Sequence, residues 1–501
     1  MTPVLLLAVV LLLLLHLYRA ATTRPPNFPP GPPSLPVWGA YWLLLLGNYS
    51  YTHKGFAWLA RRYRTRVVGL YLGPYPAVVA CDGPSIRETL SRPELQGRLD
   101  TFVTRERQLR RLLGVFFVDG PFWRAQRRFM LRHMRDQGFG RRSARQEALV
   151  AQEVGDILEV LRGARPDRDV FRDGRAYVPD VFCHVFLNAL WAMMFGDVFS
   201  RGDHAPSRRL VAMGFRFHRN TDPTGAALSL TPWLRYLAPM ASGHAGMWDA
   251  NEYMLRELRA AIDEHLASFS SDHLRDFCDA FLGRMEHGDA DASFSVEQLL
   301  IVALDLLLPT LTTVTATLSF AVQCLLRHPG VQAAVQAELD AVVGRARLPT
   351  LDDRARLPYT EATLREVMRR RPILPLGVAH RATEDTQLAG YAIPKDTMVV
   401  TSLYSYHSDP DVFPEPRAFR PERFLDADGK LLKKDLTLPF GAGKRLCAGE
   451  TFSRHTMFLV FAGLLQNFSF VVPPGEKFSD TKPIPGLVLS PPEFWVKVEA
   501  R

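Results

Sequence analysis

The sequence predicts a mainly α-helical body with a small β-rich lobe at its edge. Three segments carry apolar residues at three- and four-residue spacing with charged residues between them, as amphipathic helices do; they are residues 143–161, 247–269 and 331–343. Strand signals are fewer and lie in residues 66–79, which are rich in Val, Tyr and Leu, and in residues 390–403. With 501 residues, 47% of them hydrophobic, the chain can bury a large core.

The chain opens with an apolar run from Val4 to Leu15. The first positive charges, Arg19 and Arg24, follow this run, whereas a cleaved signal peptide would carry them before it. We therefore predict that residues 1–22 form a retained membrane anchor with the body of the chain in the cytoplasm. A signal peptide is the alternative. A second apolar stretch, Val37 to Leu46, suits either the membrane interface or ordinary core packing.

Residues 23–36 are rich in proline, so we expect a stiff and extended hinge there. We place a single catalytic domain after it, at residues 37–501. The net charge of +9 comes without a zinc-finger, helix-turn-helix or RNA-binding signature, so we expect no nucleic-acid partner. The five cysteines are far apart and form no Cys-x-x-Cys pair, which argues against a disulfide framework.

One glycine-rich run contains a cysteine that suits a metal. The run is Phe440-Gly441-Ala442-Gly443-Lys444-Arg445-Leu446-Cys447-Ala448-Gly449. A metal and nearby backbone N–H groups can keep a thiolate ionised, and glycines allow the backbone to approach the sulfur closely. Arg445 can bind an anionic cofactor edge in a bidentate manner. A glycine-rich turn around a buried thiol is the alternative.

This run resembles the haem-binding loop of the cytochrome P450 family, Phe-x-x-Gly-x-Arg-x-Cys-x-Gly, at every fixed position. The resemblance implies the cytochrome P450 fold and a haem b cofactor, iron protoporphyrin IX, with the Cys447 thiolate as its axial ligand. It also implies that Phe440 and Gly441 contact the haem. The likeness extends along essentially the whole chain and is greatest to the microsomal clan that contains vertebrate drug-oxidising and arthropod hormone-processing members, some insect branches among them.

Trp123 and Arg127 stand four residues apart, so a helix would present an indole N–H and a guanidinium on one face. Such donors suit carboxylates, and the pair resembles the family's Trp-x-x-x-Arg signature. The resemblance implies that Trp123, Arg127, His380 and Arg445 contact the haem propionates. Taken singly, Trp123 also suits a core position and His380 a hydrogen-bonded loop.

Glu366 and Arg369 share a helix face at three-residue spacing. Alone, such a pair is common on protein surfaces and contributes little to stability. With Arg423, in the segment Pro421-Glu422-Arg423-Phe424, it resembles the buried triad of the family. The resemblance implies a structural role behind the haem-binding loop.

Residues 305–314, Asp-Leu-Leu-Leu-Pro-Thr-Leu-Thr-Thr-Val, depart from the family pattern. Counting from Asp305 places the family's oxygen-side threonine at Thr313 and its usual acid at Thr312. A shift by one residue would make Thr312 the catalytic threonine. Pro309 removes an N–H from the helix and favours a kink. The family acid belongs to the proton route for oxygen activation, so Thr312 in its place predicts slow or poorly coupled turnover.

The implied function is haem-thiolate monooxygenation of a small lipophilic substrate, which is a lipid, a hormone-like molecule or a xenobiotic. The implied partner is NADPH-cytochrome P450 reductase, and the implied location is the cytoplasmic face of the endoplasmic reticulum membrane. Two alternatives keep the haem without oxygen activation: an isomerase or dehydratase, and a haem-based ligand-binding protein. We expect substrate contacts in residues 115–117, 215–217, 307–313 and 374–378. Basic residues expected to face the reductase are Arg124, Arg127, Arg128, Arg132, Arg135, Arg141, Arg142, Arg145, Lys433, Lys434 and Lys444.

Overall fold

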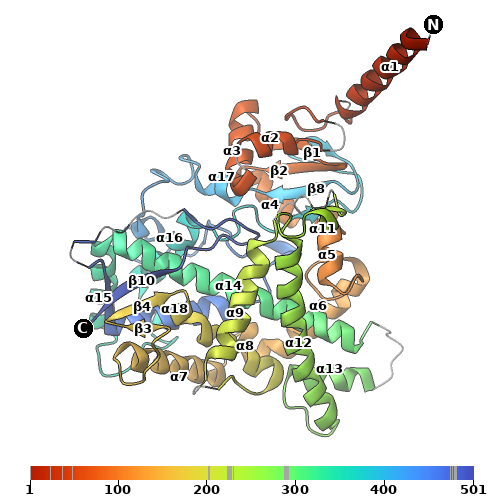
Figure 1. Ribbon diagram of the computed structural model, residues 1–501. Coiled ribbons are helices and arrows are strands. Elements are labelled where there is room, and N and C mark those ends of the chain that lie inside the picture. The colour runs from red at the N-terminus through yellow and green to blue at the C-terminus, as the bar shows by residue number, and fades with distance from the viewer. Residues whose placement is uncertain are drawn as a thin grey trace.

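A long, buried helix runs through the middle of the protein in the computed structural model (Figure 1). This helix, α14 (Val296–Arg327), packs against α8 (Cys183–Phe195), α9 (Ala205–Arg219), α12 (His244–Ser268), α16 (Pro358–Arg370) and α18 (Glu450–Asn467). The structure describes residues 2–22, 24–35, 38–47, 49–200, 203–222, 228–229, 231–286, 293–473, 475–476, 478 and 482–501.

The remaining helices surround this core or lie toward the β-rich lobe. They are α1 (Thr2–Thr22), α2 (Tyr41–Gly47), α3 (Thr52–Tyr63), α4 (Gly83–Ser91), α5 (Phe102–Arg107), α6 (Gly120–Met134), α7 (Ala144–Leu161), α11 (Leu234–Leu237), α13 (Phe277–Glu286), α15 (Pro329–Val342) and α17 (Leu403–His407). The three predicted amphipathic segments are confirmed as α7, α12 and α15 within a few residues at each end. The Ser143 hydroxyl caps α7 by accepting a hydrogen bond from the Gln146 N–H.

The β-structure forms small sheets. The first sheet has the strand order β1 (Val67–Leu72), β2 (Tyr75–Ala80), β8 (Met398–Thr401), β5 (His380–Arg381). The second sheet has the strand order β3 (Phe171–Arg172), β4 (Arg175–Val178), β10 (Phe494–Ala500), β9 (Phe468–Val471). The third sheet consists of β6 (Thr386–Leu388) and β7 (Tyr391–Ile393). β1 and β2 form a hairpin whose turn contains Gly73 at φ 63°. The prediction of a mainly helical body with a small β-rich lobe is confirmed.

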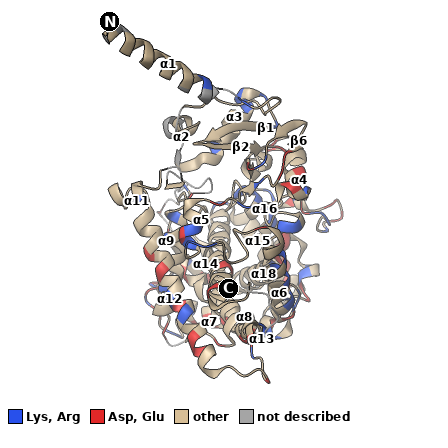
Figure 2. Ribbon diagram, turned by 90° about the vertical axis from the view of Figure 1, so that its right-hand side faces the viewer, with Lys and Arg blue, Asp and Glu red and all other residues tan. Residues whose placement is uncertain are grey.

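The N-terminal helix α1 projects from the lobe and is apolar along its length except near the body (Figures 1 and 2). Its leucines and valines from Leu5 to Leu15 are exposed, and Arg19 lies in its last turn. Of the described helices, only α14 combines the length and hydropathy of a membrane span, and 89% of that stretch is buried inside the protein. The apolar run of α1 is shorter, from Leu5 to His16.

The proline-rich segment after α1 packs on the lobe. The Gly69 N–H of β1 donates a hydrogen bond to the Pro30 carbonyl at 2.9 Å, and a β-carbon at Gly31 would lie 1.9 Å from the Gly69 carbonyl oxygen. Of the second apolar stretch, Tyr41 and Leu44 are buried in the lobe, whereas Trp38 is 41% exposed. Core packing therefore accounts for the buried residues of this stretch; Pro36, Val37 and Asn48 lie outside the described residues.

A buried carboxylate joins α16 to the loop that follows α17. The Arg369 Nε and Nη2 atoms lie 2.7 and 2.8 Å from the two Glu366 carboxylate oxygens, and Arg423 Nε lies 3.2 Å from one of them. The Arg369 side chain also donates to the carbonyls of His407, Pro416 and Ala418. The triad thus satisfies several buried backbone acceptors of an irregular loop.

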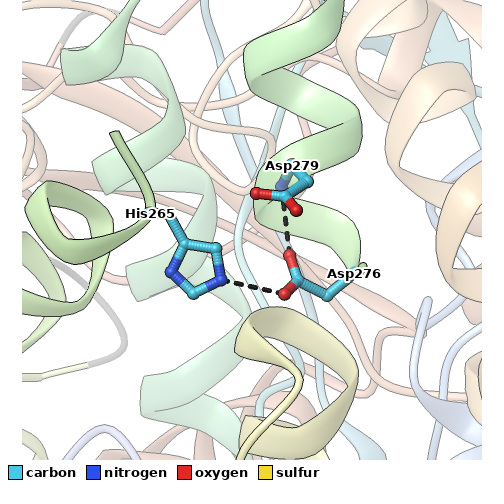
Figure 3. A group of neighbouring side chains, drawn as sticks. All are labelled: His265, Asp276 and Asp279. Atoms are coloured by element: carbon cyan, nitrogen blue, oxygen red, sulfur yellow. Dashed lines mark hydrogen bonds and ion pairs between the residues drawn. The ribbon is translucent and has the colours of Figure 1, made fainter. Parts of the chain in front are cut away.

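A histidine and two aspartates connect α12 to α13 (Figure 3). His265 Nε2 lies 2.8 Å from Asp276 Oδ2, and the Asp279 N–H donates to the other Asp276 oxygen at 3.0 Å. The hydrogen bond with Asp276 raises the pKa of His265. Both Asp279 oxygens bind Arg275, at 2.5 and 2.9 Å. Because the arginine occupies this carboxylate, the cluster is a structural ion-pair network that joins two helices.

Candidate functional site

The cysteine loop forms a tight turn before α18. The Cys447 N–H donates to the Phe440 carbonyl at 2.9 Å, which closes the loop. Gly441 and Gly443 have φ values of 72° and 68°, in the left-handed region that favours glycine. A β-carbon at Gly443 would lie 2.1 Å from the Leu90 carbonyl oxygen, so no side chain fits there. A β-carbon at Gly441 would have no neighbour within 4 Å, so open space faces this residue.

The segment before the loop is connected to the buried triad through His407. The His407 backbone carbonyl accepts from Arg369, and its ring Nε2 lies 2.6 Å from the Thr437 carbonyl oxygen. Arg454 of α18 binds Asp435 and Glu450, both at 2.9 Å. These contacts hold the loop from both sides, so the triad positions the cysteine indirectly.

Cys447 differs from the other four cysteines in its surroundings. Cys81, Cys183, Cys278 and Cys324 are buried, and burial raises the pKa of their thiols, to about 12 for Cys81 and about 11 for Cys324. Cys447 is exposed, yet desolvation is still the main cause of its raised pKa, which indicates that its surface faces a hollow inside the protein. The Gly449 N–H and the Arg127 charge act in the opposite direction and favour the thiolate.

Four side chains predicted to contact the cofactor come together beside this loop. Arg445 lies over the Trp123 ring, with its guanidinium carbon 3.7 Å from the ring centroid, and the Arg127 guanidinium carbon is 5.8 Å from the same centroid. Arg445 donates to the Gln96 and Val118 carbonyls at 2.9 and 2.8 Å. His380 Nδ1 lies 2.7 Å from the Leu95 carbonyl oxygen.

The structure adds Arg98 to this group, and the sequence analysis missed it. Arg98 is 8% exposed and donates to the Phe116 and Ala379 carbonyls at 3.2 and 3.1 Å. Desolvation, with the charges of Arg445 and Arg127, lowers the pKa of Arg98 well below its usual value. No local spacing marks this residue, because the backbone bridge between Gly97 and Arg381 places it. We name Arg98, Trp123, Arg127, His380 and Arg445 the cationic cradle.

The cradle has buried donors without a protein acceptor. Within the part of the chain that the structure describes, the Trp123 indole Nε1 and the Arg445 Nη1 atom are buried and make no hydrogen bond. An unsatisfied buried donor costs about 1–3 kcal/mol, so these atoms suit an anionic ligand. Two carboxylates, as on haem b, would satisfy them. The neutral His380 ring uses its Nδ1 proton on Leu95, and burial beside Arg98 lowers its pKa well below the usual value. His380 therefore contributes less as a donor than the two orphaned groups.

On the other side of the site, Thr313 of α14 faces a cavity, whereas Thr312 does not. Thr313 lines this cavity, and its hydroxyl donates to the Pro309 carbonyl at 2.9 Å. Thr312 is fully buried, and its hydroxyl lies 2.8 Å from His218 Nδ1 of α9. The helix stays α-helical across Pro309. The geometry therefore favours the register that puts Thr313 at the oxygen side.

The same cavity reaches from α14 to the cysteine loop. It is lined by Thr313, Val314 and Thr317 of α14, by Met368 of α16 and the following Arg371, Pro372, Ile373 and Leu374, and by Leu403, His407, Pro439, Phe440, Ser453 and Met457. The carbonyl of Ile373 accepts a hydrogen bond from the Leu489 N–H. The cavity thus reaches the cysteine loop at Phe440, whereas Cys447 and the residues of the cationic cradle are not among its lining residues.

Only some of the residues predicted to contact the substrate line this cavity. Leu374 lines the cavity with Thr313. The Val115 and Phe116 N–H groups donate to the Asp305 carboxylate at 2.6 and 2.9 Å, which fixes the loop before α6 against α14. Phe215 and Phe217 are buried in the helical core.

Known proteins match this chain over nearly its full length. The family model for cytochrome P450 matches residues 29–498. The rabbit protein "Cytochrome P450 2B4" is 34% identical over 99% of each chain, and the mouse protein "Cytochrome P450 2F2" is 35% identical over 88% of each. The silkworm protein "Farnesoate epoxidase" is 32% identical over 95% of this chain and 94% of its own. With the cysteine loop and the cradle, these matches establish that the chain belongs to the cytochrome P450 family, as a haem-thiolate monooxygenase.

Proposed function

We propose that this protein is an NADPH-dependent monooxygenase that inserts one oxygen atom into a small lipophilic substrate held beside Thr313. The observation that carries the proposal is one cavity with Thr313 at one side and the cysteine loop at the other. Most of its other lining residues are apolar, which suits a substrate with few polar groups. The relative named farnesoate epoxidase supports an isoprenoid carboxylic acid or ester as the first substrate to test.

We assign each site residue a role in this reaction. Cys447 ligates the iron as thiolate, and Phe440 and Gly441 border the haem face at the cysteine loop. Trp123, Arg127, Arg445 and Arg98 hold the propionates, with His380 beside them. When bound, a haem with a thiolate ligand supplies oxygen activation. Thr313 holds a hydroxyl in the cavity, where it can orient a water or pass on a proton.

Monooxygenation can be tested by isotope labelling. The purified protein with a microsomal P450 reductase, NADPH, ¹⁸O₂ and farnesoate or methyl farnesoate should give a product that carries one ¹⁸O atom, because the second oxygen atom leaves as water. Boiled protein and reactions without NADPH are the controls. Mass spectrometry of the product measures the label, and a second arm uses a panel of lipophilic drugs. Products that form without NADPH and without label from ¹⁸O₂ would instead support the isomerase or dehydratase.

We propose that the reductase docks on a basic stripe of α6, formed by Arg124, Arg128 and Arg132. These exposed arginines are four residues apart, and the described residues form no ion pair with them. Trp123 and Arg127 precede them by one residue on the same helix, so the stripe flanks the haem contacts. By contrast, Arg135 and Arg141 bind Asp136, and Arg142 binds Glu147 and Asp352.

Charge reversal tests this docking surface. The double variant Arg128→Glu/Arg132→Glu should slow reduction by the reductase severalfold at low salt, because like charges oppose docking, and should lose its salt dependence. Arg168→Glu, an exposed arginine between α7 and β3, controls for net charge. Stopped-flow reduction kinetics are the measurement. Equal rates in the double variant and in the wild type would place the docking surface elsewhere.

We propose that α1 anchors the protein in the endoplasmic reticulum membrane with the body on the cytoplasmic face. The exposed apolar residues of α1 and the following Arg19 support this orientation. A second exposed apolar group on α11 and beside it, Trp233, Tyr236, Leu237 and Met240, lies toward the same end of the molecule as α1 in both views (Figures 1 and 2).

Protease protection tests the orientation. In intact microsomes, protease added outside should digest the body, because it lies in the cytoplasm. Detergent-opened microsomes give the reference digest, and N-terminal sequencing of the mature protein checks retention of α1. Protection of the body in intact vesicles, or a mature N-terminus near residue 22, would contradict the proposal.

A further inference from the structure

One side of α3 carries three cations around an exposed indole, and we name these four residues the α3 face. They are Lys54, Trp58, Arg61 and Arg62. All four are exposed, and the indole is 49% exposed. Their spacing of four, three and one residues places them on one side of a helix. Lys54 Nζ lies 4.5 Å from the centroid of the Tyr51 ring, and no carboxylate of the described residues forms an ion pair with the three cations.

The opposite side of α3 is packed into the lobe. Phe56, Ala57 and Leu59 are each at most 3% exposed. The short helix α2 also packs closely against α3, since a β-carbon at Gly55 would lie 3.1 Å from Leu44 Cδ2. Because its apolar side is fixed in this way, α3 holds the α3 face outward. The cations therefore stay in solvent or meet a partner from outside the chain.

The C-terminal end of α3 lies near the end of α1. Arg24, two residues after α1, donates to the Gly31 carbonyl at 2.8 Å and to the Gly69 carbonyl of β1 at 3.5 Å. Desolvation lowers the pKa of Arg24, and the neighbouring Tyr63 and Tyr71 act in the opposite direction. Tyr63 is the last residue of α3. The two helices accordingly lie toward the same end of the molecule in both views (Figures 1 and 2).

We propose that the α3 face binds the anionic headgroups of phospholipids in the membrane that α1 enters. The inference rests on the proposed anchoring by α1 and goes beyond it, because an apolar helix does not distinguish one headgroup from another. The cytoplasmic leaflet carries anionic phosphatidylserine and phosphatidylinositol, which attract basic residues beside a membrane anchor. Ammonium and guanidinium groups both bind phosphate oxygens.

The indole favours a lipid surface over an acidic protein as the partner. The basic stripe of α6 consists of arginines, whereas Trp58 stands between the cations of the α3 face. Indole rings concentrate at the boundary between headgroups and acyl chains, and an aromatic ring beside basic residues is typical of helices that lie on a membrane. Because α1 ends beside α3, its insertion brings the α3 face to the membrane surface.

Lys54 can report on this contact without turnover. The full-length holoprotein is placed in nanodiscs of phosphatidylcholine, alone or with added phosphatidylserine. A water-soluble acylating reagent then modifies the lysines, and mass spectrometry measures the rate at each one. A headgroup phosphate over Lys54 covers the amine and keeps it protonated. The rate at Lys54 should therefore fall about fivefold in the anionic discs, the factor expected for one basic residue at such a surface. The exposed Lys433 and Lys434 are internal controls and should react equally in both discs.

A charge variant tests whether the arginines of the α3 face carry this selectivity. Arg61→Gln/Arg62→Gln keeps Lys54 as the reporter and should remove most of its protection in anionic discs, because two of three cations are lost. The matched control is Arg168→Gln/Arg256→Gln, which removes two exposed arginines outside α3 and should be protected as the wild type is. Haem content and melting temperature report whether each variant is folded.

Further arms identify the source of the anion. Inorganic phosphate or soluble glycerophosphoserine, added to neutral discs, should leave Lys54 reactive, and protection by either would overturn the membrane contact in favour of a free-phosphate site. Protection that appears in neutral discs only when the reductase is added would overturn it in favour of a protein partner.

Two outcomes separate this inference from the anchor. Equal Lys54 rates in neutral and anionic discs, or protection that survives Arg61→Gln/Arg62→Gln, would overturn the role of the α3 face and leave the anchor intact. A chain that does not enter discs of either composition would overturn the anchoring by α1 and this inference with it.

Discussion

The site depends on one buried carboxylate, Glu366, which two arginines share. Removing one partner of such a pair generally costs about 3–5 kcal/mol, because an uncompensated charge stays buried. Here Arg369 has a second task, since its guanidinium binds the carbonyls of His407, Pro416 and Ala418. His407 in turn binds the Thr437 carbonyl, three residues before Phe440. The ion pair thus fixes an irregular loop, and that loop fixes the cysteine.

The arginines of the cationic cradle repel one another, and the protein's own acids do not fully neutralise them. Arg98, Arg127 and Arg445 are gathered in low-dielectric surroundings, and desolvation lowers the pKa of each, to about 10 for Arg445. Asp119 is the acid among them, and it also binds Arg381 at 2.8 Å. The anionic propionates of a bound haem would relieve this repulsion and would accept a hydrogen bond from the Trp123 indole N–H. Cofactor binding should therefore stabilise the fold as well as supply the chemistry.

The fold class and the helices whose apolar residues recur every three or four positions could be predicted from the sequence. Amphipathic spacing and helix capping depend on residues that are close together in the chain. The sequence also predicted that the cysteine loop, Trp123, Arg127 and Arg445 would meet, since the family motif links them. Arg98 was missed because the backbone bridge between its neighbour Gly97 and Arg381, which are 284 positions apart, places it. The Thr312–His218 contact was missed for the same reason: two helices 94 residues apart meet there. The hinge packs along β1 through close glycine contacts that proline content does not reveal.

The central claim is that Cys447, and no other cysteine, supplies the thiolate to the iron. The most direct test is the spectrum of the reduced carbon monoxide complex. Cys447→Ser should lose the thiolate-type Soret band, whereas Cys81→Ser and Cys324→Ser, which alter buried thiols of raised pKa, should keep it. Haem content measured in parallel separates loss of the ligand from loss of the cofactor. A thiolate-type band that persists in Cys447→Ser but disappears in another cysteine variant would contradict the account.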